Sequence, residues 1–177
     1  LALSGTTNLN VTGSWSNSGT FTSNQSTVTF NGSANNVTQS VNPGASSFYN
    51  LTIANTGTGT AKVQLSTNAL TITNNMTVTA GTFDPNALTV TGTGTNALSV
   101  TGTILVDAST FAGSYASFET VTLNAGSTVN YSGTTQTIDS TLSYVNLTTS
   151  GSGTKPLGGA TGATGTVTVS AGTLNPG

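Results

Sequence analysis

Short runs in which every second residue is apolar are the feature that most limits how this chain can fold. Thr, Asn, Ser or Gln stands between the apolar residues, and Gly, Asn or Pro separates the runs about every 8–10 residues. This alternation is typical of strands with one buried face, and no run has a helical period. The sequence therefore predicts an all-β fold of very short strands. Examples are the pairs Val28 and Phe30, Leu51 and Ile53, Val63 and Leu65, Met76 and Val78, Leu98 and Val100, and Val167 and Val169.

The chain also contains an internal repeat, seen as four matches in the same order. The matched segments are NLNVTG at 8–13 and ALSVTG at 97–102, STVTFNG at 26–32 and STVNYSG at 127–133, FYNLTIANTGTGTAK at 48–62 and SYVNLTTSGSGTK at 143–155, and TVTAGTFDPN at 77–86 and TVSAGTLNPG at 168–177. The offsets are 89, 101, 96 and 91 residues (97 − 8, 127 − 26, 146 − 50 and 168 − 77). We therefore predict one solenoid made of two tandem copies, residues 1–86 and 87–177.

The junction between the copies resembles the junction that forms when the end of the chain is joined to its beginning. AGTFDPN runs into ALTVTG, and AGTLNPG would run into LALSGT. The sequence is thus expected to be a mature or excised segment of a longer array, or a subunit that continues into another copy.

Two architectures fit these short strands. One is a β-solenoid, in which successive coils stack along an axis. The other is a pair of immunoglobulin-like β-sandwich modules of about 90 residues each. The solenoid is favoured because the apolar residues are mostly small aliphatics that suit a narrow interior. Low charge also suits stacked coils, since like side chains lie about 4.8 Å apart in neighbouring strands. Two sandwich modules would each be expected to contain a buried Trp, but Trp15 has no counterpart in the second copy.

The stretch from Thr27 to Phe83, with its NG, YNLTI, GTAK and AGTF segments, resembles the β-strand repeats of large bacterial surface proteins of the adhesin and filamentous-haemagglutinin type. The resemblance covers both copies. It implies a right-handed parallel β-helix, an adhesive or scaffold role, and a prokaryotic cell surface. It brings no catalytic residues.

Composition excludes several classes of function. The 177 residues include two Lys+Arg, four Asp+Glu, no His and no Cys. So few basic residues remove the electrostatic basis for binding nucleic acid or anionic membranes, and no apolar run is long enough to cross a bilayer. Without His or Cys the chain cannot build Ser-His-Asp or Cys-His nucleophile systems. We expect the protein to have no enzymatic activity, no cofactor and no metal site. We expect it to be extracellular or on the cell surface.

The four acids are candidates for a polysaccharide-cleaving site, which needs a pair of carboxyl groups. Asp107 and Glu119 are the candidate pair. They lie where the second copy is about a dozen residues longer, so an acid pair is not a feature of the repeat. Asp84 and Asp139 have no acidic counterpart in the other copy. Solvated loop carboxylates are the more ordinary interpretation of all four.

The remaining candidate residues belong to the repeat. Lys62 and Lys155 are interpreted as solubilising charges at strand edges, or alternatively as contacts between subunits or Lys–Asn crosslinks. Asn50 and Asn146 are interpreted as corner residues, or secondly as glycan sites. Phe48, Tyr49 and Tyr144 should fill the coil or cap its corner, and Leu51 and Leu147 should face inward. Trp15 should cover one end of the core, or else form a platform for a sugar ligand.

The function expected from these features is structural: a segment that stacks or continues end to end in a filament, stalk or adhesin shaft. Its partners would be further copies or neighbouring repeats. The alternatives are an adhesin that binds a carbohydrate or another surface, an ice-binding protein, suggested by Thr-x-Thr pairs such as Thr77 and Thr79, and a polysaccharide-active β-helix enzyme.

Overall fold

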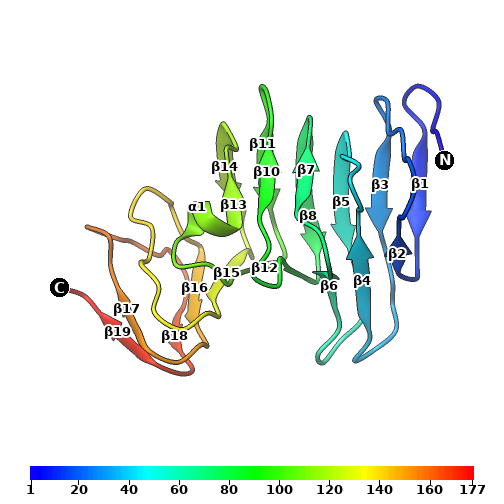
Figure 1. The fold of residues 1–177 in the computed structure, drawn as a ribbon. Helices are drawn as coiled ribbons and strands as arrows, with labels where there is room; N and C mark the ends of the chain where they lie inside the picture. The colour runs from blue at the N-terminus through cyan, green and yellow to red at the C-terminus, as the bar shows by residue number, and fades with distance from the viewer.

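The computed structural model describes all 177 residues as a parallel β-solenoid, with the N- and C-termini at opposite ends of its long axis (Figure 1). Every pairing between strands is parallel. Paired residues lie between 18 and 26 positions apart (146 − 128 and 41 − 15), which is the length of one coil. The predicted solenoid is thus confirmed. The alternative of two β-sandwiches is wrong, because their sheets would be antiparallel.

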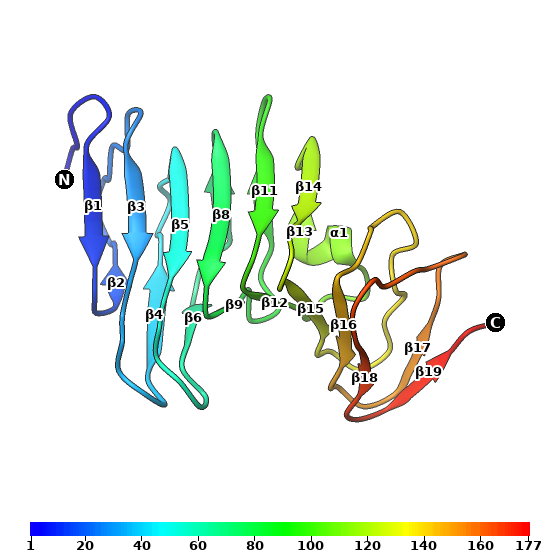
Figure 2. The same ribbon diagram turned by 180° about the vertical axis from the view of Figure 1, so that it is seen from behind.

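One face of the solenoid is a six-stranded sheet whose strands follow one another along the axis (Figure 2). Its strands alternate between inward apolar residues and outward Thr, Asn or Ser, as in Val28 and Thr29 of β3. They are β1 (Asn8–Val11), β3 (Thr27–Phe30), β5 (Asn50–Ala54), β8 (Asn75–Ala80), β11 (Ala97–Val100) and β14 (Thr120–Leu123).

A second face is an eight-stranded sheet that continues further toward the C-terminus. Its strands are β2 (Trp15–Ser16), β4 (Thr38–Asn42), β6 (Lys62–Leu65), β9 (Thr82–Asp84), β12 (Thr103–Val106), β15 (Thr128–Tyr131), β16 (Asn146–Thr149) and β18 (Val167–Val169). The smaller sheets are formed by β7 (Leu70–Ile72), β10 (Val90–Gly92) and β13 (Tyr115–Ala116), and by β17 (Thr154–Pro156) and β19 (Thr173–Asn175).

One short helix, α1 (Phe111–Ser114), departs from the expectation of strands and turns alone. The Thr110 side chain caps it by accepting a hydrogen bond from the Gly113 N–H, and Phe111 is buried against the Tyr115 ring at 5.2 Å. The helix lies in the stretch by which the second copy is longer. At four residues, α1 is far too short to cross a bilayer, and the structure has no other helix.

A single hydrophobic core of 26 buried residues runs through the coils, in place of the two separate cores that tandem sandwiches would have. Phe30, Phe48, Tyr131 and Tyr144 are its largest fully buried aromatic residues together with Phe83. The core is therefore continuous along the axis, as stacking of coils requires.

Three of the four matched segments form strands on different faces in the two copies, whereas β1 and β11 share one face. The segments that match in sequence form β3, β5 and β8 in the six-stranded sheet, but β15, β16 and β18 in the eight-stranded sheet. The face changes after the extra stretch with α1, where β15 pairs with β12 and β14 becomes an edge strand. β15 therefore stacks on β12, whereas its counterpart β3 stacks on β1, the strand that resembles β11 in sequence. The boundaries of the predicted copies, 1–86 and 87–177, stay a prediction.

Candidate functional site

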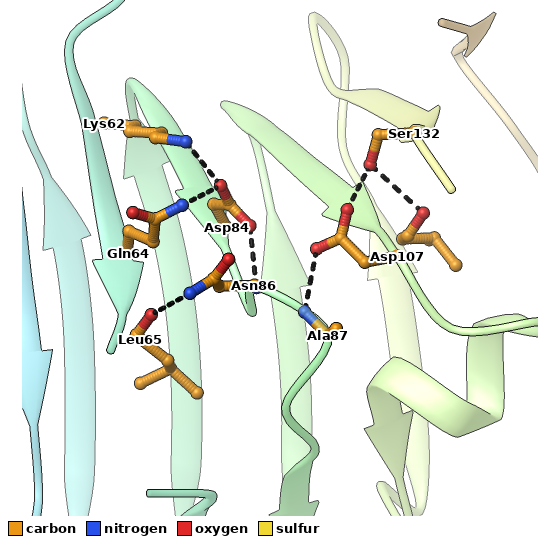
Figure 3. A network of polar contacts seen from close by, with 9 residues as sticks. Lys62, Gln64, Leu65, Asp84, Asn86, Ala87, Asp107 and Ser132 are labelled. Atoms are coloured by element: carbon orange, nitrogen blue, oxygen red, sulfur yellow. Dashed lines mark hydrogen bonds and ion pairs between the residues drawn. The ribbon is translucent and has the colours of Figure 1, made fainter. Parts of the chain in front are cut away.

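The largest cluster of charged groups is a network on the eight-stranded sheet (Figure 3). The Lys62 ammonium lies 2.6 Å from the Asp84 carboxylate in the structure's one salt bridge. The Gln64 amide donates to the same oxygen at 2.6 Å, because Gln64 and Asp84 are paired residues of β6 and β9. The other Asp84 oxygen accepts the Asn86 N–H at 2.7 Å. Asp84 is 4% exposed, so this carboxylate is buried with three donors around it.

Asp107 extends the network to the next coils. One of its oxygens accepts the Ser132 hydroxyl at 2.5 Å, and the other accepts the Ala87 N–H at 3.5 Å. Asp107 follows β12 and Ser132 follows β15. The network therefore joins four consecutive strands of the sheet, β6, β9, β12 and β15, through side chains.

The two carboxyl groups have opposite pKa shifts. Burial alone would raise the pKa of Asp84, but the hydrogen bond from Lys62 and further hydrogen bonds outweigh it and lower this pKa. Burial raises the pKa of Asp107, and the Asp84 charge adds to the rise against the hydrogen bond from Ser132. Asp107 therefore takes up a proton before Asp84 does.

This arrangement differs from the acid pair considered from the sequence. The neighbours of Asp107 are Asp84 and Ser132, while Glu119 is exposed just before β14, where its N–H contacts Asn96. None of the surface depressions is lined by Asp84, Asp107 or Glu119. Asp139 lines a shallow one, but its Oδ1 accepts both the N–H and the hydroxyl of Thr141. The network is better explained as a set of polar contacts that hold neighbouring coils together than as a substrate site.

Lys155 lies in a different environment from Lys62, and the interpretation of Lys155 as a solubilising charge is wrong. Its side chain is fully buried, and its ammonium donates to the carbonyl oxygens of Ser152 at 2.7 Å, Gly133 at 2.8 Å and Gly151 at 3.4 Å, and of Thr134. Burial lowers the pKa of Lys155. No carboxylate neutralises this charge, so the carbonyl dipoles of two turns hold it.

A difference of three residues in the preceding loop explains the contrast. Lys62 follows Asn50 of the NLT segment by 12 residues (62 − 50), whereas Lys155 follows Asn146 by 9 (155 − 146), and an odd difference reverses the direction of the side chain. Because successive residues of a strand face opposite sides, a shift of one residue moves a side chain from the surface to the core. Lys155 pairs with the half-buried Leu174, whereas Lys62 precedes the buried Val63 that pairs with Phe83. Neither lysine has an asparagine side chain among its contacts, and an intact mass lower by one ammonia would be needed to support a Lys–Asn crosslink.

The other repeat residues take related places in both copies. Phe48, Leu51, Tyr144 and Leu147 are buried, and Tyr49 is half-buried. Asn50 and Asn146 begin β5 and β16. Their side-chain oxygens accept main-chain N–H groups of the next coil, from Asn75 at 3.3 Å and from Thr166 at 3.0 Å. They are thus corner residues that bind one coil to the next.

Trp15 lies in the first coil and covers that end of the core. Its ring packs edge-on against Phe21 at 5.0 Å and Phe48 at 5.6 Å. The indole N–H is buried and has no hydrogen-bond partner. The residues that sequence reasoning missed are Gln39 and Gln136, whose buried amides bind main-chain groups of the preceding coil. Gln39 follows Gly32 by seven residues and Gln136 follows Gly133 by three, and this spacing does not distinguish them from surface amides.

Comparisons of the chain with models of known protein families, with curated proteins and with solved structures find no match.

Proposed function

We propose that this chain is a structural segment of an extracellular filament, stalk or adhesin shaft, which stacks on or continues into further copies of itself. The single observation that carries the proposal is the form of the two end coils. Each end coil has strands with one unpaired edge, and their inward residues are incompletely covered, such as Val11 of β1 and Val169 of β18. Unpaired edges of this kind are ready to pair with another strand.

The body of the solenoid supports a mechanical role. Parallel ladders run along the axis, and the Lys62–Asp84–Asp107 network and the Lys155 contacts join successive coils through side chains. A load along the axis would thus be shared by main-chain and side-chain hydrogen bonds. The resemblance to repeats of bacterial surface proteins supports the same interpretation.

Electron microscopy of the untagged protein tests this proposal. We expect fibres or rods of varying length with the width of one solenoid, in proportions that increase with protein concentration. A population of single, uniform particles at every concentration would contradict the association of copies.

A second candidate function is binding to a regular surface such as ice. It is favoured by an outward ladder on the six-stranded sheet that contains no charged residue. The ladder consists of Asn10, Thr29, Thr52, Thr77, Ser99 and Thr122, which are paired in register. Thermal hysteresis that is lost in Thr52→Lys would support this candidate, and absence of hysteresis in the native protein would remove it.

A further inference from the structure

We propose that a second copy of this chain stacks on the last coil in one defined register, with its β1 beside β18 and its β2 beside β19. This inference rests on the proposed association of copies and specifies the surface that carries it. Two kinds of observation support it: the apolar residues that the last coil leaves uncovered, and an internal step between coils that has the same pattern.

The last coil presents the uncovered apolar surface. Val167 and Val169 of β18 are 51% and 50% exposed, although they continue the columns of the buried Leu147 and Thr149. Leu174 of β19 lines the same hollow as Val167. Burying two valines and a leucine under another coil would favour association through the hydrophobic effect.

The interior of the chain shows which residues cover this pattern. Within it, β8 and β9 are followed by β11 and β12. In that step Leu98 pairs with Met76, Val100 with Val78, and Ile104 with Phe83.

The last coil repeats the pattern of β8 and β9, the strands that are covered in this step. Val167, Val169 and Leu174 follow Met76, Val78 and Phe83 at a constant offset of 91 residues (167 − 76, 169 − 78 and 174 − 83). The spacing of the three inward positions is therefore identical in the two places.

The first coil repeats the pattern of β11 and β12, the strands that cover β8 and β9. Leu9, Val11 and Trp15 precede Leu98, Val100 and Ile104 at a constant offset of 89 residues (98 − 9, 100 − 11 and 104 − 15). All three are half-buried in the single chain. Placed on the last coil of another copy, Leu9 lies opposite Val167, Val11 opposite Val169, and Trp15 opposite Leu174. No charged residue occurs in β1, β2, β18 or β19, so no charge opposes this approach.

Glycines at the ends of these strands support the same register. A Cβ on Gly102 would lie 2.6 Å from the carbonyl oxygen of Gly81, so the close approach of these coils requires glycine. Gly13 corresponds to Gly102, yet a Cβ there would meet nothing within 4 Å. Gly81 and its counterpart Gly172 both have a φ of +74°. In the proposed register Gly13 approaches the Gly172 carbonyl, which gives Gly13 the role that Gly102 has inside the chain.

Cysteine crosslinking between copies tests the register, since the chain has no native cysteine. Asn10 and Thr168 are the exposed outward residues between the paired inward ones, and would lie about 5 Å apart across the junction. Chains carrying Asn10→Cys and Thr168→Cys are mixed and treated with a short bifunctional thiol reagent. The matched control replaces Thr168→Cys with Ser170→Cys, which shifts the exposed thiol by two residues along the strand direction.

A glycine substitution gives an independent readout. Gly13→Val should abolish association, measured by sedimentation, and leave the circular dichroism spectrum and the melting temperature unchanged. Gly19→Val is the control, because Gly19 also has open space around a Cβ but lies beyond the matched stretch.

The outcomes separate this inference from the proposed function. Crosslinking of 10 to 168 at a yield at least several-fold above that of 10 to 170, with loss of association in Gly13→Val, would support the register. If the native protein forms fibres but 10 and 168 do not crosslink, or Gly13→Val associates normally, the register is wrong and the structural function stands. If the native protein never associates, the association itself fails and the register fails with it.

Discussion

Gln39 and Gln136 make the same pair of contacts in the two halves of the chain. The Gln39 amide nitrogen donates to the carbonyl oxygens of Val11 at 3.0 Å and Gly13 at 2.9 Å. The Gln136 amide nitrogen donates to those of Val106 at 2.7 Å and Ala108 at 2.6 Å. Each buried glutamine thus binds the end of a strand in the preceding coil, β1 in one case and β12 in the other.

The two glutamines should differ in their contribution to stability. The Gln39 side-chain oxygen accepts from the Gly32 N–H at 2.9 Å and from Asn55 at 2.7 Å, whereas that of Gln136 is buried without a partner. Gln39→Met should therefore lower the free energy of unfolding by about 2–3 kcal/mol, and Gln136→Met by about 1–2 kcal/mol. Urea denaturation measures both, and a larger loss for Gln136→Met would contradict the assignment of these contacts.

The Asp84 and Asp107 carboxyls should give opposite pH dependences of stability. Because the folded-state pKa of Asp84 is lowered, the stability it contributes is present above its ordinary value of 3.8 and lost as pH falls through the lowered pKa. The pKa of Asp107 is raised, so its contribution is present below 3.8 and lost as pH rises through the raised pKa.

Substitutions separate the two acids. Asp84→Asn should destabilise the fold by about 1 kcal/mol at neutral pH, since Lys62 loses its partner. Asp107→Asn should be neutral or stabilising at neutral pH and should remove the decrease in stability between acidic and neutral pH. Melting temperatures between pH 3 and 7 or so provide the measurement, with Glu119→Gln as a control on an exposed acid. Destabilisation by Asp107→Asn at neutral pH would argue against the raised pKa.

Buried tyrosines should make the fold sensitive to alkaline pH. The Tyr131 and Tyr144 hydroxyls lie 2.8 Å apart, and Tyr144 donates to the Asp139 carbonyl oxygen at 2.8 Å. Burial raises the pKa of Tyr131 to about 12, and raises the pKa of Tyr144 further above its ordinary value of 10.0. Since the unfolded chain loses these protons first, stability should fall as pH rises above 10.0.

Tyrosinate absorbance recorded with circular dichroism checks this prediction. Ionisation of Tyr131 and Tyr144 should coincide with unfolding, and Tyr131→Phe with Tyr144→Phe should make the alkaline loss of stability smaller. Full ionisation in a folded protein near pH 10 would show that these hydroxyls are accessible.

Lys155 should contribute more to stability than Lys62, although both belong to similar sequence segments. Lys155→Met removes the donor for several carbonyl oxygens and should cost about 1.5–3 kcal/mol, whereas Lys62→Met should cost about 0–1 kcal/mol. Acylation of the native protein should modify Lys62 and leave Lys155 unmodified until the chain unfolds. Rapid modification of both lysines in the native state would contradict the burial of Lys155.

The local structure could be predicted from the sequence because alternation is a local property. Leu51 and Ile53, or Leu98 and Val100, lie on strands with their side chains inward, as the pattern indicates. The solenoid itself followed from the shortness of these strands. The helix α1 could not be predicted, since four residues held by the Thr110 cap and the burial of Phe111 have no periodic signal.

The positions of particular side chains depended on coil length, which the pattern does not specify. The inward direction of Lys155 results from a loop shorter by three residues (12 from Asn50 to Lys62 against 9 from Asn146 to Lys155), and the proximity of Asp107 to Asp84 depends on which coils become neighbours. The change of face between β14 and β15 results from the extra stretch before them. Such features are set by the number of residues per coil, and matching of segments alone does not reveal them.

The change of face has a consequence for any filament built in the proposed register. The six-stranded sheet of each added copy would continue the eight-stranded sheet of the copy below, so every subunit would be turned about the axis relative to the last. The Thr-rich ladder would then point in a different direction in each successive copy and follow a helical path around the filament. A ligand that binds this ladder would therefore find binding faces on all sides of the filament.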